Sequence, residues 1–194
     1  MNLDVLYNCD YMVYKKNFDL PWDVISSDLE KYKDETRYLS SIMQDRGYND
    51  NGQKITNEYK KFGYSEHNTK IWKTTNQQPK IDLEWEQAVI DELPLDHAVA
   101  TLTRQDPGQI LPWHYDRFFM LKRLFPNDTR PILRFLLFLQ DWQIGHVLQV
   151  NNSMLTHWQR GTVVVWRPEQ YHVSANIGLT TKWTCNITGF LRND

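Results

Sequence analysis

The sequence predicts a mainly β fold with helices in its N-terminal part, arranged as a double-stranded β-helix, which is a jelly roll of the cupin type. Two observations predict it. From residue 97 onward, short apolar or alternating runs follow one another with turn signals between them, as in two packed sheets of short strands. Before residue 97, the regular apolar patterns have helical spacing. The 194 residues suit a single domain, with 1–96 as a helical and loop-rich elaboration and 97–194 as the core.

The N-terminal part contains three segments. Residues 18–45 are expected to be helical because apolar side chains such as Ile25 and Leu29 recur at helical spacing. Residues 46–80 are polar and rich in Asn, Gly, Lys and Gln, so they are either a long functional loop or a partly ordered surface segment. Residues 82–92 are expected to form a short helix that ends before a proline.

The second half contains eight expected strands. They are bounded by turn residues such as Asp106-Pro107-Gly108 and Arg160-Gly161. We place them at 97–104, 109–115, 132–140, 146–150, 153–157, 162–166, 171–175 and 182–190. Strands of this length, with few helices between them, predict a double-sheet jelly roll.

Charge is unevenly distributed along the chain. The net charge of −2 argues against a general nucleic-acid binder. Residues 1–96 carry 12 Lys and Arg against 18 Asp and Glu, whereas residues 97–194 carry 10 against 6. Most of the cations in the second half are Arg, which suits a small dicarboxylate ligand because guanidinium binds carboxylate in a bidentate fork. The same pattern also fits two halves that neutralise each other.

The cysteines and the hydropathy of the sequence indicate the cellular compartment of the protein. Cys9 and Cys185 lie far apart and form no metal-binding spacing or disulfide framework. Their pattern favours a reducing compartment. No apolar N-terminal segment and no run of 18 apolar residues occurs, so we expect a cytoplasmic protein without a membrane span.

A metal site is indicated by His114, Asp116 and His172. Residues i and i+2 of a strand point to the same face, so His114 and Asp116 can aim one imidazole and one carboxylate at a single point. His-x-Asp alone is a weak signal. His172, on a later strand, offers the second imidazole. Two histidines and one carboxylate form the facial triad of non-haem Fe(II) oxygenases, which leaves positions open for other ligands.

Four segments in order carry a resemblance to a known family. They are Asp106-Pro107-Gly108…Pro112-Trp113-His114-Tyr115-Asp116, then 134–139, then 161–166, then His172…Asn176-Ile177-Gly178…Lys182-Trp183. Together they resemble the Fe(II)/2-oxoglutarate-dependent dioxygenases over roughly residues 97–190. Two branches are similar, the prolyl 4-hydroxylases and the aspartyl/asparaginyl hydroxylase-like enzymes. In the second branch the distal histidine is followed by Asn, Gly and Arg at the spacings found here, with Lys182 in place of Arg.

The resemblance implies a function and a set of roles. It implies a hydroxylase that uses Fe(II), 2-oxoglutarate and O2 and acts on an amino-acid side chain, free or in a peptide or protein. His114, Asp116 and His172 would be the catalytic metal ligands. Lys182 would bind the C5 carboxylate of 2-oxoglutarate, and Arg134 would also contact this cosubstrate.

Two departures from the family pattern bear on these contacts. Leu136 stands where the second branch often has histidine, and residues 117–130 form a basic insertion. Alternation puts Lys182 and Thr184 on one face of their strand and Trp183 and Cys185 on the other, without saying which face is inside.

Two alternatives belong to other functional classes. One is a jelly-roll module that binds metal without catalysis, although all three ligands and the basic residue are present. The other is a 2-oxoglutarate oxygenase that acts on a nucleobase. The negative net charge, and the lack of the second arginine that nucleic-acid demethylases are expected to have after the distal basic residue, make nucleic acid an unlikely partner.

Overall fold

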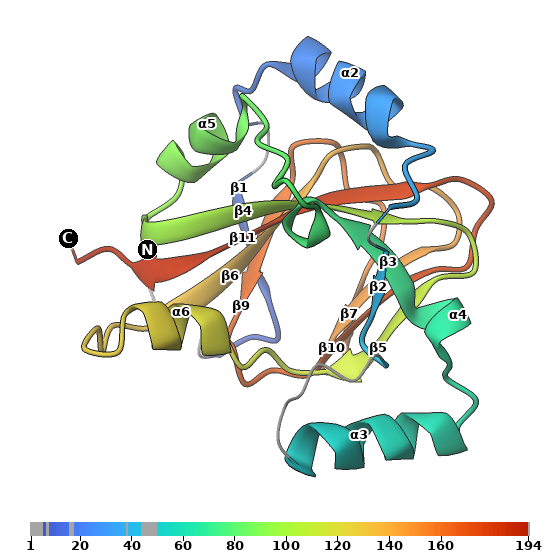
Figure 1. Ribbon diagram of the computed structural model, residues 1–194. Coiled ribbons are helices and arrows are strands. Elements are labelled where there is room, and N and C mark those ends of the chain that lie inside the picture. The colour runs from blue at the N-terminus through green and yellow to red at the C-terminus, as the bar shows by residue number, and fades with distance from the viewer. Residues whose placement is uncertain (1–5, 7, 16–17, 38, 44–49, 194) are drawn as a thin grey trace.

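Two antiparallel sheets face each other in the structure (Figure 1). It is a computed structural model that describes residues 6, 8–15, 18–37, 39–43 and 50–193. The major sheet has the strand order β1-β9-β6-β11-β4-β3-β2, and the minor sheet has the order β5-β10-β7-β8. Strands that are distant in the chain alternate as neighbours, which is the arrangement of a jelly roll. The predicted double-stranded β-helix fold is therefore confirmed.

All eight strands expected after residue 97 are present. Their alternating or wholly apolar sequences match strands that are covered on one or both faces. They are β4 (Leu95–Gln105), β5 (Ile110–His114), β6 (Ile132–Phe138), β7 (His146–Val150), β8 (Ser153–Leu155), β9 (Val163–Trp166), β10 (His172–Asn176) and β11 (Lys182–Leu191). The basic insertion after β5 contains a short helix, α6 (Phe119–Leu124).

The first half of the chain differs from the expectation in two places. The helix expected over 18–45 is shorter, because α2 (Trp22–Tyr32) is followed by turn residues and by β2 (Ser40–Ser41); residues 44–45 lie outside the described part. The polar segment 46–80 is not one long loop where it is described. It contains α3 (Asp50–Lys61), α4 (Glu66–Thr69), β3 (Lys70–Lys73) and a 3-10 turn, η1 (Thr74–Asn76).

Three N-terminal strands extend the major sheet. They are β2, β3 and β1 (Met12–Lys15), which pairs with β9. The short helix expected near residue 82 is also present, as α5 (Glu86–Asp91). These strands have two to four residues, too few to show a period of alternation, and pairing with long neighbours stabilises them.

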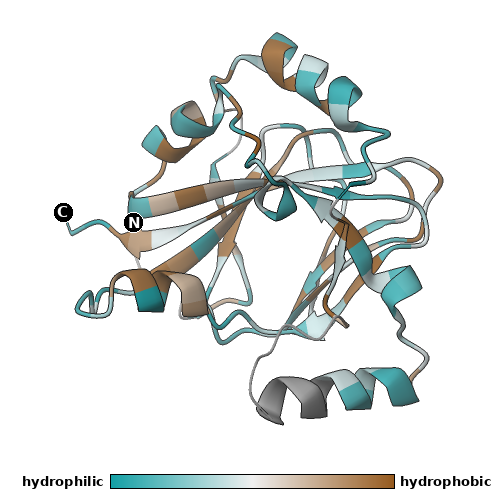
Figure 2. Ribbon diagram, viewed as in Figure 1, coloured by the Kyte–Doolittle hydropathy of each residue, from teal (hydrophilic) through white to brown (hydrophobic). Residues whose placement is uncertain are grey.

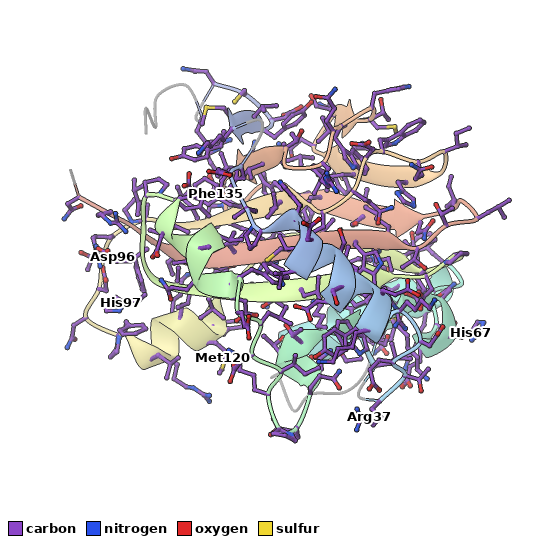
Figure 3. All side chains as sticks on the ribbon, turned by 90° about the horizontal axis from the view of Figure 1, so that it is seen from above. Arg37, His67, Asp96, His97, Met120 and Phe135 are labelled. Carbon is purple, nitrogen blue, oxygen red and sulfur yellow. The ribbon has the colours of Figure 1, made fainter. Side chains whose placement is uncertain are left out.

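The main core lies between the major sheet and the helices that cover its outer face. Helices α2 and α5 lie on this face (Figure 1), and Ile25 of α2 is fully buried against the sheet. Trp72 of β3 stacks on Tyr32 with ring centroids 5.5 Å apart. Brown, hydrophobic residues recur along the strands in Figure 2, whereas α2 and α5 carry both brown and teal residues. In the view from above (Figure 3), Phe135 is labelled within the strand layers.

A second, smaller core fills part of the space between the two sheets. It consists of Leu136, Phe138, Leu148, Val150, Trp158, Val164 and Trp166. Lys182 points into this space, because its neighbours Trp183 and Cys185 belong to the main core under the helices. Both faces of β11 are therefore buried, and the structure answers the question of orientation that alternation left open.

Two further observations concern membrane spans and disulfides. None of the helices in the described part of the chain is long and apolar enough to cross a membrane. Cys9 and Cys185 are not joined in a disulfide.

Candidate metal centre

Three side chains that can bind a metal meet where β5 and β10 pair. His114 ends β5 and lies opposite His172, which begins β10. Asp116 follows two positions after His114, and its backbone N–H donates to the carbonyl of Pro168 at 3.2 Å. One ligand atom of each residue lies within 4.8 Å of the others. The structure thus brings together the three residues that the sequence indicated, and this triad could bind a metal ion.

Backbone carbonyls orient both imidazoles. Nδ1 of His114 lies 2.6 Å from the carbonyl oxygen of Pro112, and Nδ1 of His172 lies 3.1 Å from that of Gln170. When each Nδ1–H donates to its carbonyl, each Nε2 carries a lone pair that faces the shared space. Trp166 packs against the His172 ring with centroids 4.9 Å apart, which restricts its rotation.

Asp116 provides a buried oxygen that suits a cation. Its Oδ2 is buried and has no hydrogen-bond donor among the described residues. Nε of Arg134 lies 3.1 Å from this oxygen, yet the pair has ionic contact without hydrogen-bond geometry. Nε2 of His172 lies 3.7 Å from the same oxygen. A buried carboxylate oxygen without a donor, next to two imidazole lone pairs, fits a divalent metal.

Burial keeps both imidazoles neutral. It lowers the pKa of His114 to about 3, and the neighbouring His172 lowers it as well. Burial also lowers the pKa of His172, although Asp116 opposes this shift. For Asp116, burial alone would raise the pKa, but the facing Arg134 and the histidines bring it below its usual value. At neutral pH the site therefore offers two neutral imidazoles and one carboxylate, the protonation state that metal binding requires.

Lys182 is a buried cation near this triad. Its side chain is 1% exposed, and its Nζ donates to the carbonyl of Val147 at 2.5 Å and to the hydroxyl of Ser174 at 2.8 Å. Within the described residues, no carboxylate lies at ion-pair distance from Nζ, and burial lowers the pKa of Lys182 to about 7. Ser174 follows His172 by two positions on β10, roughly 7 Å along the strand.

Two glutamines fix the surroundings of Lys182. The Ser174 hydroxyl donates to Oε1 of Gln105 at 2.6 Å, and Nε2 of Gln105 donates to the Ser174 carbonyl at 3.1 Å. On the other side, Gln140 accepts from the N–H of Trp183 at 3.1 Å and donates to the carbonyl of Thr181 at 3.0 Å. Gln140 thereby holds the backbone on both sides of Lys182.

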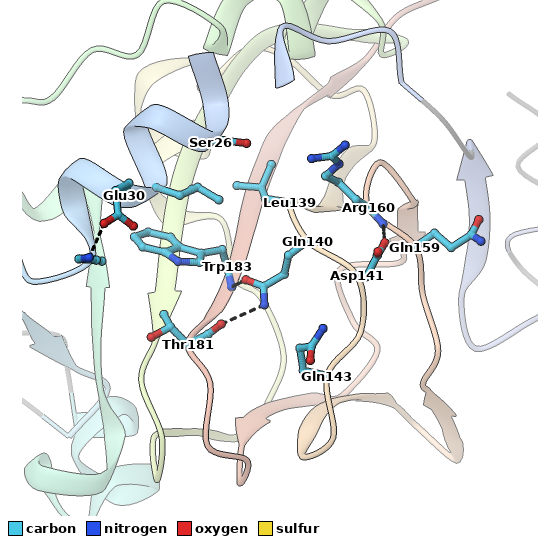
Figure 4. Close-up of a pocket in the computed structure, with 12 residues that line it drawn as sticks. Ser26, Glu30, Leu139, Gln140, Asp141, Gln143, Gln159, Arg160, Thr181 and Trp183 are labelled. Carbon is cyan, nitrogen blue, oxygen red and sulfur yellow. Dashed lines mark hydrogen bonds and ion pairs between the residues drawn. The ribbon is translucent and has the colours of Figure 1, made fainter. Parts of the chain in front are cut away.

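Gln140 lines an open groove of about 830 Å³ on the outer face of β11 (Figure 4). The groove lies between α2 and residues 139–143, and Trp183 forms part of its lining. The groove is separate from the metal centre, because Trp183 and Lys182 point to opposite faces of the strand.

Arg134 and Lys182 lie at different ends of the interior. Arg134 of β6 pairs in register with Thr188 of β11, six positions from Lys182, which is roughly 20 Å along the strand. The guanidinium of Arg134 lies 5.2 Å from the ring of Phe118. The expected contact between Arg134 and the cosubstrate is not tested by this geometry and stays a prediction.

The remaining histidines lie apart from the triad. His67 and His97 are labelled at opposite edges of Figure 3, and His97 stacks on Phe125 at 4.1 Å. His157 stacks on Trp142 at 4.3 Å. His146 is 1% exposed and lies 3.0 Å from the Thr180 carbonyl through Nε2, while its buried Nδ1 has no partner among the described residues.

Sequence reasoning did not identify Ser174 as a contact of Lys182, or Gln105 and Gln140 as the residues that fix its surroundings. One signal was available for Ser174, because it is two positions from His172 and must share its face. Gln105 and Gln140 act through side-chain bonds between strands that are distant in sequence, and no local pattern indicates them.

Comparisons with known proteins identify the fold. No family profile matches the sequence, and no curated protein is detectably similar to it in sequence. A solved structure of a prolyl-4-hydroxylase from Pseudomonas putida is similar over 99% of this chain and 97% of that chain, with a TM-score of 0.57 and 18% identity. At this level of identity the likeness shows a shared fold.

Two cupin-type structures are similar over smaller parts of the chain. One is a predicted oxalate decarboxylase from Thermotoga maritima (TM-score 0.39, 12% identity, 63% of this chain and 82% of that chain). The other is a cupin protein from Bacteroides fragilis (TM-score 0.35, 14% identity, 52% of this chain and 71% of that chain).

Proposed function

We propose that this protein is an Fe(II)- and 2-oxoglutarate-dependent hydroxylase that acts on an amino-acid side chain, free or within a protein. One observation carries the proposal. A fully buried lysine without a carboxylate partner in the described structure, Lys182, donates to Ser174, which lies two strand positions from His172 of the His-Asp-His triad. An uncompensated buried cation is costly, so its presence indicates an anionic ligand. The hydroxylase fold of the Pseudomonas putida structure is consistent with this function.

His114, Asp116 and His172 would hold the iron. When bound, Fe(II) activates O2 and couples the oxidative decarboxylation of 2-oxoglutarate, to succinate and CO2, to hydroxylation of a C–H bond. The protein would supply three ligands, two imidazoles and one carboxylate, a set that leaves positions for cosubstrate and O2. Both imidazoles are oriented in advance by the backbone carbonyls of Pro112 and Gln170.

Lys182 would bind the C5 carboxylate of 2-oxoglutarate. Its distance from the triad, judged from the strand rise between His172 and Ser174, suits a five-carbon dicarboxylate that reaches from the metal into the interior. Ser174 and the Val147 carbonyl hold Nζ in place, so little reorganisation is needed when the ligand binds. Arg134 as a second cosubstrate contact, and a cytoplasmic location, stay predictions.

The experiment is a succinate assay. Protein purified without oxygen is supplied with Fe(II), 2-oxoglutarate and O2, alone and with candidate amino acids and peptides. We expect succinate above the level of a His172→Ala control that has the same circular dichroism spectrum. Metal binding without succinate across all candidates would instead favour a non-catalytic metal-binding module.

A further inference from the structure

Two cations, Arg134 and Lys182, lie on different sides of the metal centre. Arg134 lies at Asp116, whereas Lys182 lies beyond His172, so the triad separates the two. If Lys182 takes the far carboxylate of the cosubstrate, Arg134 is on the side that remains for the molecule to be oxidised. This assignment of the two sides rests on the proposed function.

Arg134 is placed to bind an anion other than Asp116. Its side chain is 23% exposed, and Asp116 is its only ion-pair partner in the described part of the chain. A carboxylate that ligates a metal shares its charge with the ion, which weakens its pairing with Arg134. Burial of a guanidinium without a full counter-charge is costly, and a second carboxylate would remove this cost. Phe118, 5.2 Å from the guanidinium, helps to fix its position.

One more cation, Lys73, contributes to this side of the metal centre. Lys73 follows Trp72, which faces the main core, so alternation turns Lys73 to the interior. The charge of Lys73 is near enough to lower the pKa of Asp116. Positive charge of this density would raise the local concentration of an anionic substrate.

We propose that Arg134 binds a carboxylate of the primary substrate, in place of the cosubstrate contact that the resemblance implies, and that the substrate is therefore a small free acid, of which a free amino acid is the simplest kind. A guanidinium accepts a carboxylate in a bidentate geometry that also fixes the orientation of the rest of the molecule. Within a polypeptide the α-carboxylate is an amide, which offers Arg134 no such partner.

The test compares acids with their amides on protein loaded with Mn(II) and saturating 2-oxoglutarate. The probes are the common L-amino acids and their α-carboxamides, and the readouts are the melting temperature and calorimetric affinity. We expect at least one amino acid to bind, and its amide to bind at least tenfold more weakly. Arg134→Gln should abolish that difference, and Arg134→Lys should keep part of it. The exposed Arg160, which borders the separate groove, provides the control variant Arg160→Gln, with no expected change.

Mn(II) and 2-oxoglutarate affinities are measured first on every variant. If wild type binds neither, the proposed function fails. If it binds both and no amino acid binds, or an amide binds as well as its acid, only the present inference is wrong. If Arg134→Gln weakens 2-oxoglutarate itself more than tenfold, Arg134 belongs to the cosubstrate and the inference is again wrong. Tighter binding of acidic peptides than of any free acid would also overturn it.

Discussion

Lys182 is the residue whose surroundings depart most from those of an ordinary lysine. Its Nζ has two neutral acceptors and, among the described residues, no carboxylate. We expect Lys182→Met to weaken 2-oxoglutarate binding by roughly 10- to 100-fold, since a charge-assisted hydrogen bond contributes about 1.5–3 kcal/mol. Calorimetry on the Mn(II)-loaded protein measures this. Lys122→Met, at an exposed position, is the matched control. Equal affinities for wild type and Lys182→Met would exclude Lys182 from the site.

The same lysine predicts how binding depends on pH. Burial lowers the pKa of Lys182 to about 7 in the ligand-free protein, and a bound carboxylate would raise it by favouring the charged form. Below pH 7 the lysine is already protonated, and affinity is constant. Above pH 7, binding takes up a proton, so the dissociation constant of 2-oxoglutarate should rise by up to tenfold per pH unit.

Calorimetry in buffers of different ionisation enthalpy measures this proton uptake. Lys182→Arg, which stays charged, should bind with little dependence on pH over the same range. A pH-independent affinity of the wild-type protein, without proton uptake, contradicts the prediction.

At the residue scale, the triad was predictable because its three members have recognisable chemistry and spacing. The direction in which the Lys182 side chain points was not predictable. Both faces of β11 are buried, so the alternation of polar and apolar residues does not show which face lies between the sheets. The contact between Arg134 and Asp116 also depends on the pairing of distant strands.

At the scale of elements, the turn at Gly145 packs against the turn at Ile177 and Gly178, which precedes β11 and Lys182. The backbone N–H of Ile177 donates to the carbonyl of Gly145 at 2.9 Å. A methyl group on Gly145 would lie 2.3 Å from the backbone nitrogen of Gly178, and Gly145 has a φ of +91°. Only glycine fits both the conformation and the contact.

We therefore expect Gly145→Ala to destabilise the protein strongly. The added methyl group meets backbone, which cannot move as a flexible side chain can. The free energy of unfolding, measured by urea denaturation, should fall by more than about 2 kcal/mol. Gly63→Ala is the control, because its φ is +81° but no atom lies within 4 Å of the added group; it should cost only about 1–2 kcal/mol. Equal losses for the two variants would show that the contact between the turns contributes nothing.

Elements were predictable where the pattern was long. The eight strands after residue 97 were identified because each has enough residues to alternate or to form an apolar run between turn signals. β3 was missed because Lys70-Ile71-Trp72-Lys73 lies in a polar stretch and is a strand only through its pairing with β4. The helix expected over 18–45 was too long, because its apolar pattern stops near Tyr32.

At the scale of the whole molecule, metal binding should stabilise the fold. The triad joins two strands of the minor sheet, and the ligands are brought together only in the folded chain. At a metal concentration 100 times the dissociation constant, the folded state gains about 2.7 kcal/mol. For a chain of this length we expect a rise in melting temperature of roughly 5–10 °C with Mn(II), reversed by EDTA.

His172→Ala is the control for this rise and should show little or none of it. A Mn(II)-induced rise of the same size in His172→Ala would mean that the ion binds elsewhere.

The fold class itself was predictable from many short strands with few helices, whereas the joining of N-terminal strands to the major sheet was not.

The pairing of His114 with His172 also has a consequence for the order of folding. The two strands that carry them are hydrogen-bonded neighbours, yet most of the jelly roll lies between them in sequence. Closing so long a loop is slow, and contacts of this kind form late. The metal site is therefore expected to form late in folding, so that metal affinity reports on the completion of folding. A chain interrupted before β10 would lack His172, the third member of the triad, however well its earlier strands have formed.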